Sequence, residues 1–224
     1  MPEKRGVLLP AYVVADESAS MSPHQGELAS GLASLCEGLR AEPMAAARIR
    51  LAVLGFSDDA QLRQELSDMR SIEVLPQFII RGITSYGSAF RDLLSRIPRD
   101  VDQLKQDNYA VNRPVVFFLS DGQPTDRDWR GPHRQLTDRE SNRSAPNIIS
   151  CGIGSARADT MVEVATRQEF AFVAVAGADI GRAISNFFQA LTASLVSSGQ
   201  AMASGQSTLI LEKPNEFHLA IDEV

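Results

Sequence analysis

The sequence predicts an α/β fold in which helices cover both faces of a central, mostly parallel sheet of about six strands. Short apolar runs alternate along the chain with longer segments of helical period, which is typical of parallel strands joined by helical crossovers. The 224 residues are 44% hydrophobic and 22% charged, a globular composition that excludes wholesale disorder. A chain of this length can build one large hydrophobic core.

The predicted strands are continuous apolar runs, as expected where helices cover both faces of a sheet. The segment VVFFL is the most strand-like of them. A short turn at Ser57–Asp59 joins two successive strands, so the second of these is expected to be an antiparallel edge strand. In chain order the predicted strands are Val7–Ala15, Arg48–Phe56, Ala60–Leu66, Val115–Leu119, Asn147–Ile153 and Glu169–Ala174.

The predicted helices carry apolar residues three and four positions apart along one face. The first begins at Ser22-Pro23, where an N-cap residue precedes a proline at the first helical position. A second begins at Ala89, and Pro98 is expected to bend or end it. The others are a short helix near His133–Glu140, a short helix at Asp159–Thr166 and a long closing helix at 178–197.

One domain is expected over residues 5–197, followed by a linker and tail over 198–224. Residues 197–206 are small and polar, as in a flexible linker. Thr208–Glu212 is β-prone, and apolar and polar residues alternate over 217–221, which favours a short hairpin. Because an isolated hairpin is marginally stable, it should pack on its own domain or on another molecule, and a disordered tail is the alternative.

Charge and cysteine content limit the partners and the compartment. The chain has 28 acidic and 22 basic residues, a formal net charge of −6, and no basic cluster of the kind that binds nucleic acid. No apolar run approaches the roughly 20 residues that span a bilayer, and Pro10 interrupts the apolar start of the chain. Two cysteines, Cys36 and Cys151, cannot form a disulfide framework, so a cytoplasmic location is expected.

Polar residues follow two of the predicted strands at the edge of the sheet where ligands bind in such folds. Together they offer two carboxylates and three hydroxyls, the oxygen donors that a hard cation such as Mg²⁺ prefers. Because hydroxyls are neutral, a cation held in this way would retain affinity for an external carboxylate. The residues are Asp16, Ser18 and Ser20 after the first strand, Thr84 in a later loop and Asp121 after VVFFL.

This pattern resembles the metal-ion-dependent adhesion site (MIDAS) of von Willebrand factor A (vWA) domains. The family motif is Asp-x-Ser-x-Ser, then Thr, then Asp, and these five residues match it in order. The segments GITSYGSAF and FFLSDGQPTD resemble the corresponding family segments as well. The resemblance covers about residues 5–196 and is closest to the TerY-type branch, bacterial intracellular vWA proteins associated with tellurium resistance. Ala19 departs from the family, where glycine is usual.

The resemblance implies a Rossmann-like vWA fold and a protein-binding module, not an enzyme, of a bacterial cytoplasmic stress or tellurium-resistance-type system. The partner would be a protein that presents an Asp or Glu to the metal, and kinase or phosphatase components of the same system are implied partners. Neither nucleic acid nor membrane is expected as a partner. The cation would be Mg²⁺, with Mn²⁺ or Ca²⁺ as alternatives, and its implied site residues are Asp16, Ser18, Ser20, Thr84 and Asp121.

Two other functions remain open on the sequence. A Mg²⁺-dependent phosphohydrolase would use Asp16 or Asp121, but the sequence lacks a nucleophile motif and a general base. The second alternative is a metal-free scaffold with a degenerate site. It remains open because serines often cap helices, and aspartates often stabilise turns, without binding metal.

Other sequence patterns give weaker evidence of a function. The segment CGIGSA at 151–156 resembles a dinucleotide-binding loop, but Arg157 replaces the third glycine of that motif. Asp126 and Asp128 are expected either to shape the rim of the site or to be solvated loop residues. Cys36 lies among leucines of the first helix and is expected in the core.

Overall fold

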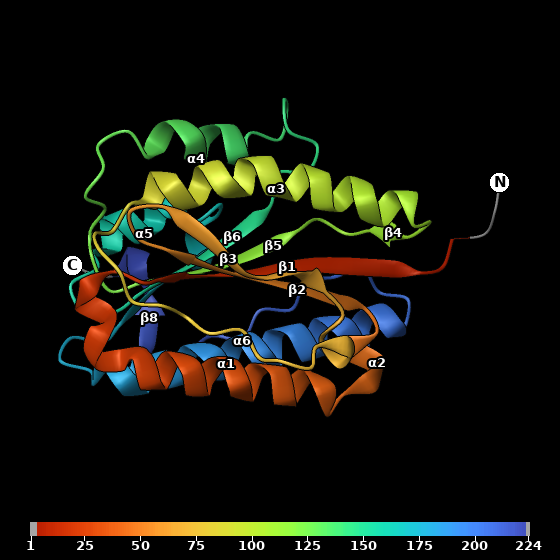
Figure 1. Ribbon diagram of the computed structural model, residues 1–224, viewed down its shortest axis with the longest axis horizontal. Coiled ribbons are helices and arrows are strands. Elements are labelled where there is room, and N and C mark those ends of the chain that lie inside the picture. The colour runs from red at the N-terminus through yellow and green to blue at the C-terminus, as the bar shows by residue number, and fades with distance from the viewer. Residues whose placement is uncertain (1–3, 223–224) are drawn as a thin grey trace.

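A mixed sheet of eight strands runs through the centre of the protein, in a computed structural model that describes residues 4–222 (Figure 1). The strand order is β3-β2-β1-β5-β6-β7-β8, and β4 pairs with the start of β1. The six strands predicted for the domain are present, β8 lies within the alternating segment 217–221, and β4 was not predicted. The bounds are β1 (Val7–Asp16), β2 (Ile49–Phe56), β3 (Ala60–Ser67), β4 (Ala110–Val111), β5 (Val115–Ser120), β6 (Asn147–Gly152), β7 (Ala171–Ala174) and β8 (Phe217–Leu219).

Parallel pairing dominates the sheet, as predicted. β1 pairs in parallel with both β2 and β5, and β6 and β7 continue the parallel order beyond β5. β3 is the predicted antiparallel edge strand. The opposite edge is antiparallel too, because β8 pairs with β7 in that orientation. The sequence predicted only the first of these two edges.

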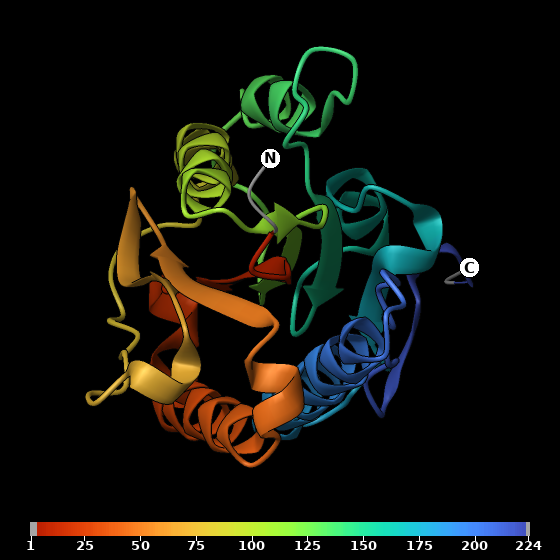
Figure 2. The same ribbon diagram turned by 90° about the vertical axis from the view of Figure 1, so that its right-hand side faces the viewer.

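Helices cover both faces of the sheet (Figures 1 and 2). Alternate residues of β1 supply both layers: Val13 belongs to the core under α1 and α6, whereas Tyr12 and Val14 belong to the core under α3. One layer contains α1 (Gln25–Arg40), α2 (Pro43–Ala46) and α6 (Ile180–Ala203), and the other contains α3 (Tyr86–Gln106), α4 (Arg130–Thr137) and α5 (Ala158–Val164). Short 3₁₀ helices occupy Ala19–His24 (η1), Met69–Ser71, Gln168–Phe170 and Ala220–Asp222.

Several helix boundaries differ from the prediction, and α3 begins at Tyr86, three residues before the predicted start. The first helix begins at Gln25, not at Ser22-Pro23, because the chain leaving β1 first forms η1. The short helix predicted near His133–Glu140 is α4, which begins and ends three residues earlier. Cys36 is buried in the core, as predicted. Within residues 4–222, no helix combines the length and the apolar character that crossing a membrane requires.

α3 continues through Pro98, so of the two expected effects of this proline, ending the helix is excluded. Proline removes one backbone hydrogen bond from a helix and crowds the preceding turn. Beyond it, however, Val101 and Leu104 extend the buried stripe that Leu93 and Ile97 begin. Burial of that stripe against the sheet therefore offsets the local cost of the proline.

Residues 204–222 pack on their own domain, one of the outcomes expected for the tail, but through contacts that the sequence did not reveal. α6 extends to Ala203, so the expected linker begins inside a helix. The segment after it is extended and lies along α6, where the buried hydroxyls of Ser194 and Ser198 accept the backbone N–H groups of Glu212 and Ile210, both at 2.8 Å. No strand forms over 208–212, and β8 pairs with β7 instead, so the predicted hairpin is wrong.

The tail should therefore contribute to stability. Phe217 in β8 is buried in the same core cluster as α1 and α6. We expect Phe217→Ala to lower the free energy of unfolding by about 3 kcal/mol or more, measured by urea denaturation, because it leaves a cavity in the core. Ile221→Ala is the matched control, since Ile221 is 47% exposed and should change stability by less than about 0.5 kcal/mol. Equal effects of the two substitutions would show that the tail does not belong to the core.

Candidate metal centre

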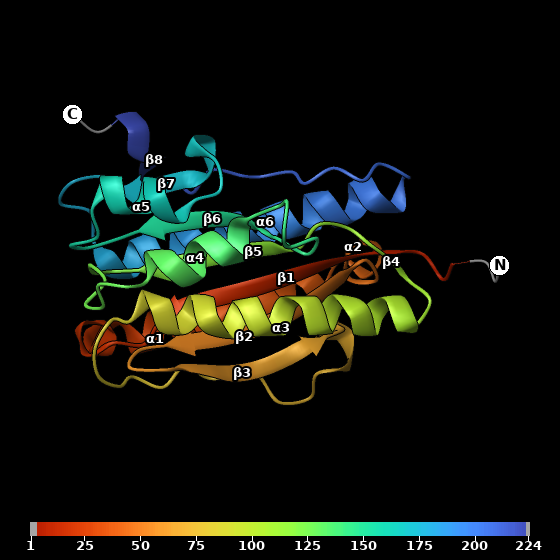
Figure 3. The ribbon, with the colours of Figure 1, turned by 90° about the horizontal axis from the view of Figure 1, so that it is seen from above.

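The five predicted site residues lie at the carboxyl ends of neighbouring strands. Asp16 is the last residue of β1, and Ser18 and Ser20 follow where the chain turns into η1. Asp121 comes directly after β5, and Thr84 lies just before α3. The sheet order reverses between β1 and β5, which is where open α/β sheets place ligands. In Figure 3 this edge lies on the left, where the red chain passes from β1 into α1.

A chain of hydroxyl and carboxylate contacts links three of these residues. The hydroxyls of Ser18 and Ser20 lie 3.0 Å apart, and the Ser20 hydroxyl donates to Oδ1 of Asp121 at 2.9 Å. Asp16 joins them through the Ser18 backbone N–H, which donates to its Oδ1 at 2.9 Å. The structure therefore brings the two aspartates and both serines together as the motif predicts.

Thr84 approaches the same point from the loop that precedes α3. It is buried, and a β-carbon placed on Gly122 would lie 3.7 Å from its Oγ1, so the hydroxyl faces the residue next to Asp121. The backbone of Thr84 is held there, because its carbonyl accepts the N–H of Thr125 at 2.8 Å and the Thr125 hydroxyl at 2.9 Å. Two loops that are distant in sequence thus fix the position of this threonine.

Burial disfavours the charged form of both carboxylates, Asp16 and Asp121. It raises the pKa of Asp16 to about 6, against hydrogen bonds from Ser120 and Ser18 that act in the opposite direction. Burial also raises the pKa of Asp121, opposed by the hydrogen bond from Ser20. Neither carboxylate forms an ion pair with any residue in the described part of the chain. A cation at this point would supply the missing positive charge.

The donor chemistry fits a hard cation that keeps some of its water. Within residues 4–222, no group of three or more His, Cys, Asp or Glu side chains is placed to hold a metal. The cluster instead offers two carboxylates and three hydroxyls, all of them oxygen donors. Such a set suits Mg²⁺, Mn²⁺ or Ca²⁺, which bind oxygen and retain water where the protein supplies few ligands.

Two residues outside the predicted five support the cluster: Ser120, which sequence reasoning missed, and Asp126, which it considered. The Ser120 hydroxyl donates to Oδ2 of Asp16 at 2.6 Å, so that each carboxylate oxygen of Asp16 accepts a hydrogen bond. Asp126, considered for the rim of the site, accepts the backbone N–H groups of Tyr86 and Gly87 at the start of α3. This contact fixes the helix that follows Thr84, and only the tertiary structure brings Asp126 to it.

The loop suspected of binding a dinucleotide serves the cluster instead. Gly154 has a φ of +60° and its α-carbon lies so close to Asp121 that a β-carbon would be 3.2 Å from the Asp121 carbonyl oxygen. The backbone N–H and the hydroxyl of Ser155 both donate to that oxygen at 2.9 Å. The glycines of CGIGSA therefore allow a close contact that holds the backbone of Asp121.

Comparison with known proteins supports the fold. No protein-family model and no curated protein matches the sequence. Among solved structures, the pilus adhesin SpaC from Lactobacillus rhamnosus GG matches 88% of this chain with a TM-score of 0.66 and 12% identity. A von Willebrand factor type A protein from Catenulispora acidiphila matches 84% with a TM-score of 0.56 and 14% identity. The chain has a vWA fold.

A third similar structure carries a metal at a MIDAS motif of its own. Proximal thread matrix protein 1 from the mussel byssus, solved with a zinc-occupied MIDAS, matches 95% of this chain with a TM-score of 0.53 and 18% identity. This chain spans 31% of the SpaC chain, 43% of the Catenulispora protein and 48% of the mussel protein. At these identities the similarity establishes the vWA fold and leaves the function to the residues of the site.

The raised pKa of Asp16 predicts how stability depends on pH in the presence of a chelator. Between about pH 4 and pH 6 the folded protein holds a proton on Asp16 that the unfolded chain releases, so this residue should lower the free energy of unfolding by about 3 kcal/mol as the pH rises through that range. Asp16→Asn stays neutral and should lose this contribution, so the difference in unfolding free energy between parent and variant, measured by urea denaturation, should change by about that amount from pH 4 to 7. The exposed Asp128→Asn should keep it. Parallel profiles for the parent and Asp16→Asn would contradict the assignment.

Proposed function

We propose that this chain is a metal-ion-dependent protein-binding module that captures a carboxylate of a partner protein through a bound divalent cation. The observation that carries the proposal is the contact chain Ser18–Ser20–Asp121, with Asp16 and Thr84 beside it, at the β1/β5 edge of a vWA fold. Two buried carboxylates form no ion pair within the described residues, so a cation would balance their charge here.

The proposed cation is held by Ser18 and Ser20 directly, and by Asp16, Thr84 and Asp121 directly or through water. When bound, it supplies a directional positive charge that a carboxylate from outside completes. The Ser20 side of the cluster is exposed, which gives a partner access. Asp16 is wholly buried and holds the Ser18 backbone, so its main contribution is to fix the loop and to balance the charge of the cation.

The surface next to the cluster suits a protein partner. Ile83 precedes Thr84 and its side chain is 53% exposed. Its backbone is nevertheless fixed, since its carbonyl accepts the Ser57 hydroxyl at 2.7 Å and its N–H donates to Asp58 at 3.3 Å. An exposed apolar side chain on a fixed backbone next to the cluster would give an arriving protein an apolar contact without ordering of the loop.

The proposed setting is a bacterial cytoplasmic stress or tellurium-resistance-type system, with kinase or phosphatase components among the partners. The motif resemblance to TerY-type proteins and the two buried, unpaired cysteines support it. Mg²⁺ is the proposed cation, with Mn²⁺ or Ca²⁺ as alternatives. A phosphohydrolase is less well supported, because the sequence offers neither a nucleophile motif nor a general base.

Calorimetric titration of Mg²⁺ into chelator-treated protein tests the proposal. We expect the parent to bind one equivalent, and Ser18→Ala and Asp121→Asn to abolish binding while leaving the circular dichroism spectrum unchanged. Asp128→Asn is the matched control: it removes an aspartate from the same connection, but Asp128 is 77% exposed and pairs with Arg91, so binding should be retained. Uptake of Mg²⁺ by Ser18→Ala and Asp121→Asn at the parental affinity would contradict the site.

A second measurement separates binding from catalysis. A pull-down with and without chelator should recover a partner with the parent only when the cation is present, and not with Asp121→Asn. The parent should release no phosphate from a generic phosphoester in Mg²⁺. Turnover that Asp121→Asn abolishes would favour the phosphohydrolase.

A further inference from the structure

We propose that Glu17, Arg63 and Arg81 form a clamp that positions Thr84 for cation binding; the inference rests on the proposed function. Glu17 lies between two site residues in the sequence. Its backbone N–H donates to the Phe56 carbonyl at 2.7 Å and so continues the ladder between β1 and β2. Its side chain is directed away from the Ser18–Ser20–Asp121 cluster, toward β3 and the loop that carries Thr84.

The Glu17 carboxylate is fully buried and saturated with hydrogen bonds. Arg63 of β3 binds it in a bidentate manner, from Nε to Oε1 at 2.8 Å and from Nη2 to Oε2 at 2.6 Å. The backbone N–H of Ile79 donates to Oε1 at 2.8 Å, and Nη2 of Arg81 donates to Oε2 at 3.2 Å. A buried carboxylate keeps its negative charge only when partners of this kind replace the water it has lost.

The neighbouring strand leaves room for this carboxylate. A β-carbon on Gly55 of β2 would lie 1.9 Å from Cδ of Glu17, so no side chain larger than glycine fits there while Glu17 keeps its place. Gly55 of β2 has no side chain, and the Glu17 carboxylate occupies the space that one would fill. This arrangement distinguishes the clamp from an ordinary surface ion pair.

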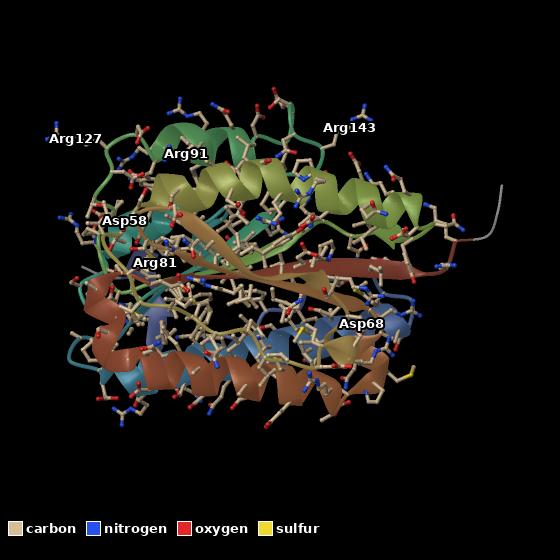
Figure 4. The ribbon with its side chains drawn as sticks, viewed as in Figure 1. Asp58, Asp68, Arg81, Arg91, Arg127 and Arg143 are labelled. Atoms are coloured by element: carbon tan, nitrogen blue, oxygen red, sulfur yellow. The ribbon has the colours of Figure 1, made fainter. Side chains whose placement is uncertain are left out.

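The clamp joins the loop before α3 to the start of the site. The backbone N–H of Arg81 donates to the Glu17 carbonyl at 2.6 Å, and the Arg81 guanidinium also contacts the carboxylate of Asp59. One residue later, the Gly82 carbonyl accepts the N–H of Ala19, which lies between the two serines, at 3.0 Å. Figure 4 shows Arg81 and Asp58 at the end of the molecule where β1 ends.

Thr84 depends on these contacts because its loop has no regular secondary structure. Residues 72–85 form neither helix nor strand. Ordering such a segment costs conformational entropy that has to be offset by specific contacts. The contacts of Glu17 and Arg81 fix it three residues before Thr84, and Ser57 fixes it one residue after, by accepting the Ser85 N–H at 3.0 Å. Without the clamp, only the contacts with Thr125 and Ser57 would hold this stretch, and the Thr84 hydroxyl would be placed less firmly beside Gly122.

Arg81→Gln tests the clamp with the least damage to the core, because Glu17 keeps its bidentate partner Arg63. We expect the dissociation constant for Mg²⁺, measured by calorimetry, to rise about tenfold, the effect typical of residues that orient metal ligands without touching the metal. Arg70→Gln is the matched control. Arg70 lies in the same connection between β3 and α3, but it pairs with Asp68, toward the other end of the molecule, and should leave the affinity unchanged.

A double-mutant cycle with Thr84→Ala distinguishes positioning from general destabilisation. If Arg81 acts through Thr84, Arg81→Gln should have little further effect on Mg²⁺ affinity in the Thr84→Ala background. If Arg81→Gln does not fold, Asp59→Asn replaces it. Asp59 is 62% exposed and touches Arg81 but not Glu17, and its substitution should weaken affinity by less than about fivefold, again only when Thr84 is present.

The outcomes separate the two proposals. If the parent, Arg81→Gln and Asp59→Asn all bind Mg²⁺ equally well, the clamp is wrong and the proposed function stands. The clamp is also wrong if the effects of Arg81→Gln and Thr84→Ala on Mg²⁺ affinity are fully additive. Parental protein that takes up no Mg²⁺ overturns the proposed function and, with it, any role of the clamp in cation binding.

Discussion

The parallel pairing of β1 with β5 is the constraint on which the candidate site depends. Ala15 and Leu119 are partners in that register, so the two strands end together and the loops that follow leave the sheet side by side. Ser20 can therefore contact Asp121 although 101 positions separate them in the sequence. Both strands are buried on both faces, and a slip of one residue would exchange the faces of every side chain, which fixes the register.

Burial at this edge gives two consecutive acidic residues opposite roles. Asp16 and Glu17 are both wholly buried, but Asp16 is held by a hydroxyl and a backbone N–H, whereas Glu17 is held by two guanidinium groups. The first arrangement leaves negative charge uncompensated and suits a cation. The second neutralises the charge and ties a loop in place. Alternation of side chains along an extended backbone separates the two environments by only one residue.

The vWA fold supplies this edge, and the side chains at the edge determine what it binds. The similar structures include a pilus adhesin and a byssus matrix protein, which share the fold at less than 20% identity. Because one fold hosts many functions, what this edge binds depends on its own side chains, such as the exposed Ile83, and not on the fold.

The sequence by itself determined the fold class, the six principal strands and the five candidate site residues, because continuous apolar runs, helical periodicity and the Asp-x-Ser-x-Ser motif are local patterns. Tertiary structure decided the rest. Pro98 stays inside α3 because residues beyond it bury against the sheet, and the tail follows α6 because Ser194 and Ser198 offer it buried hydroxyls. The role of Glu17 was invisible for the same physical reason: its partners Arg63 and Arg81 come from distant segments, and only folding sets their distances.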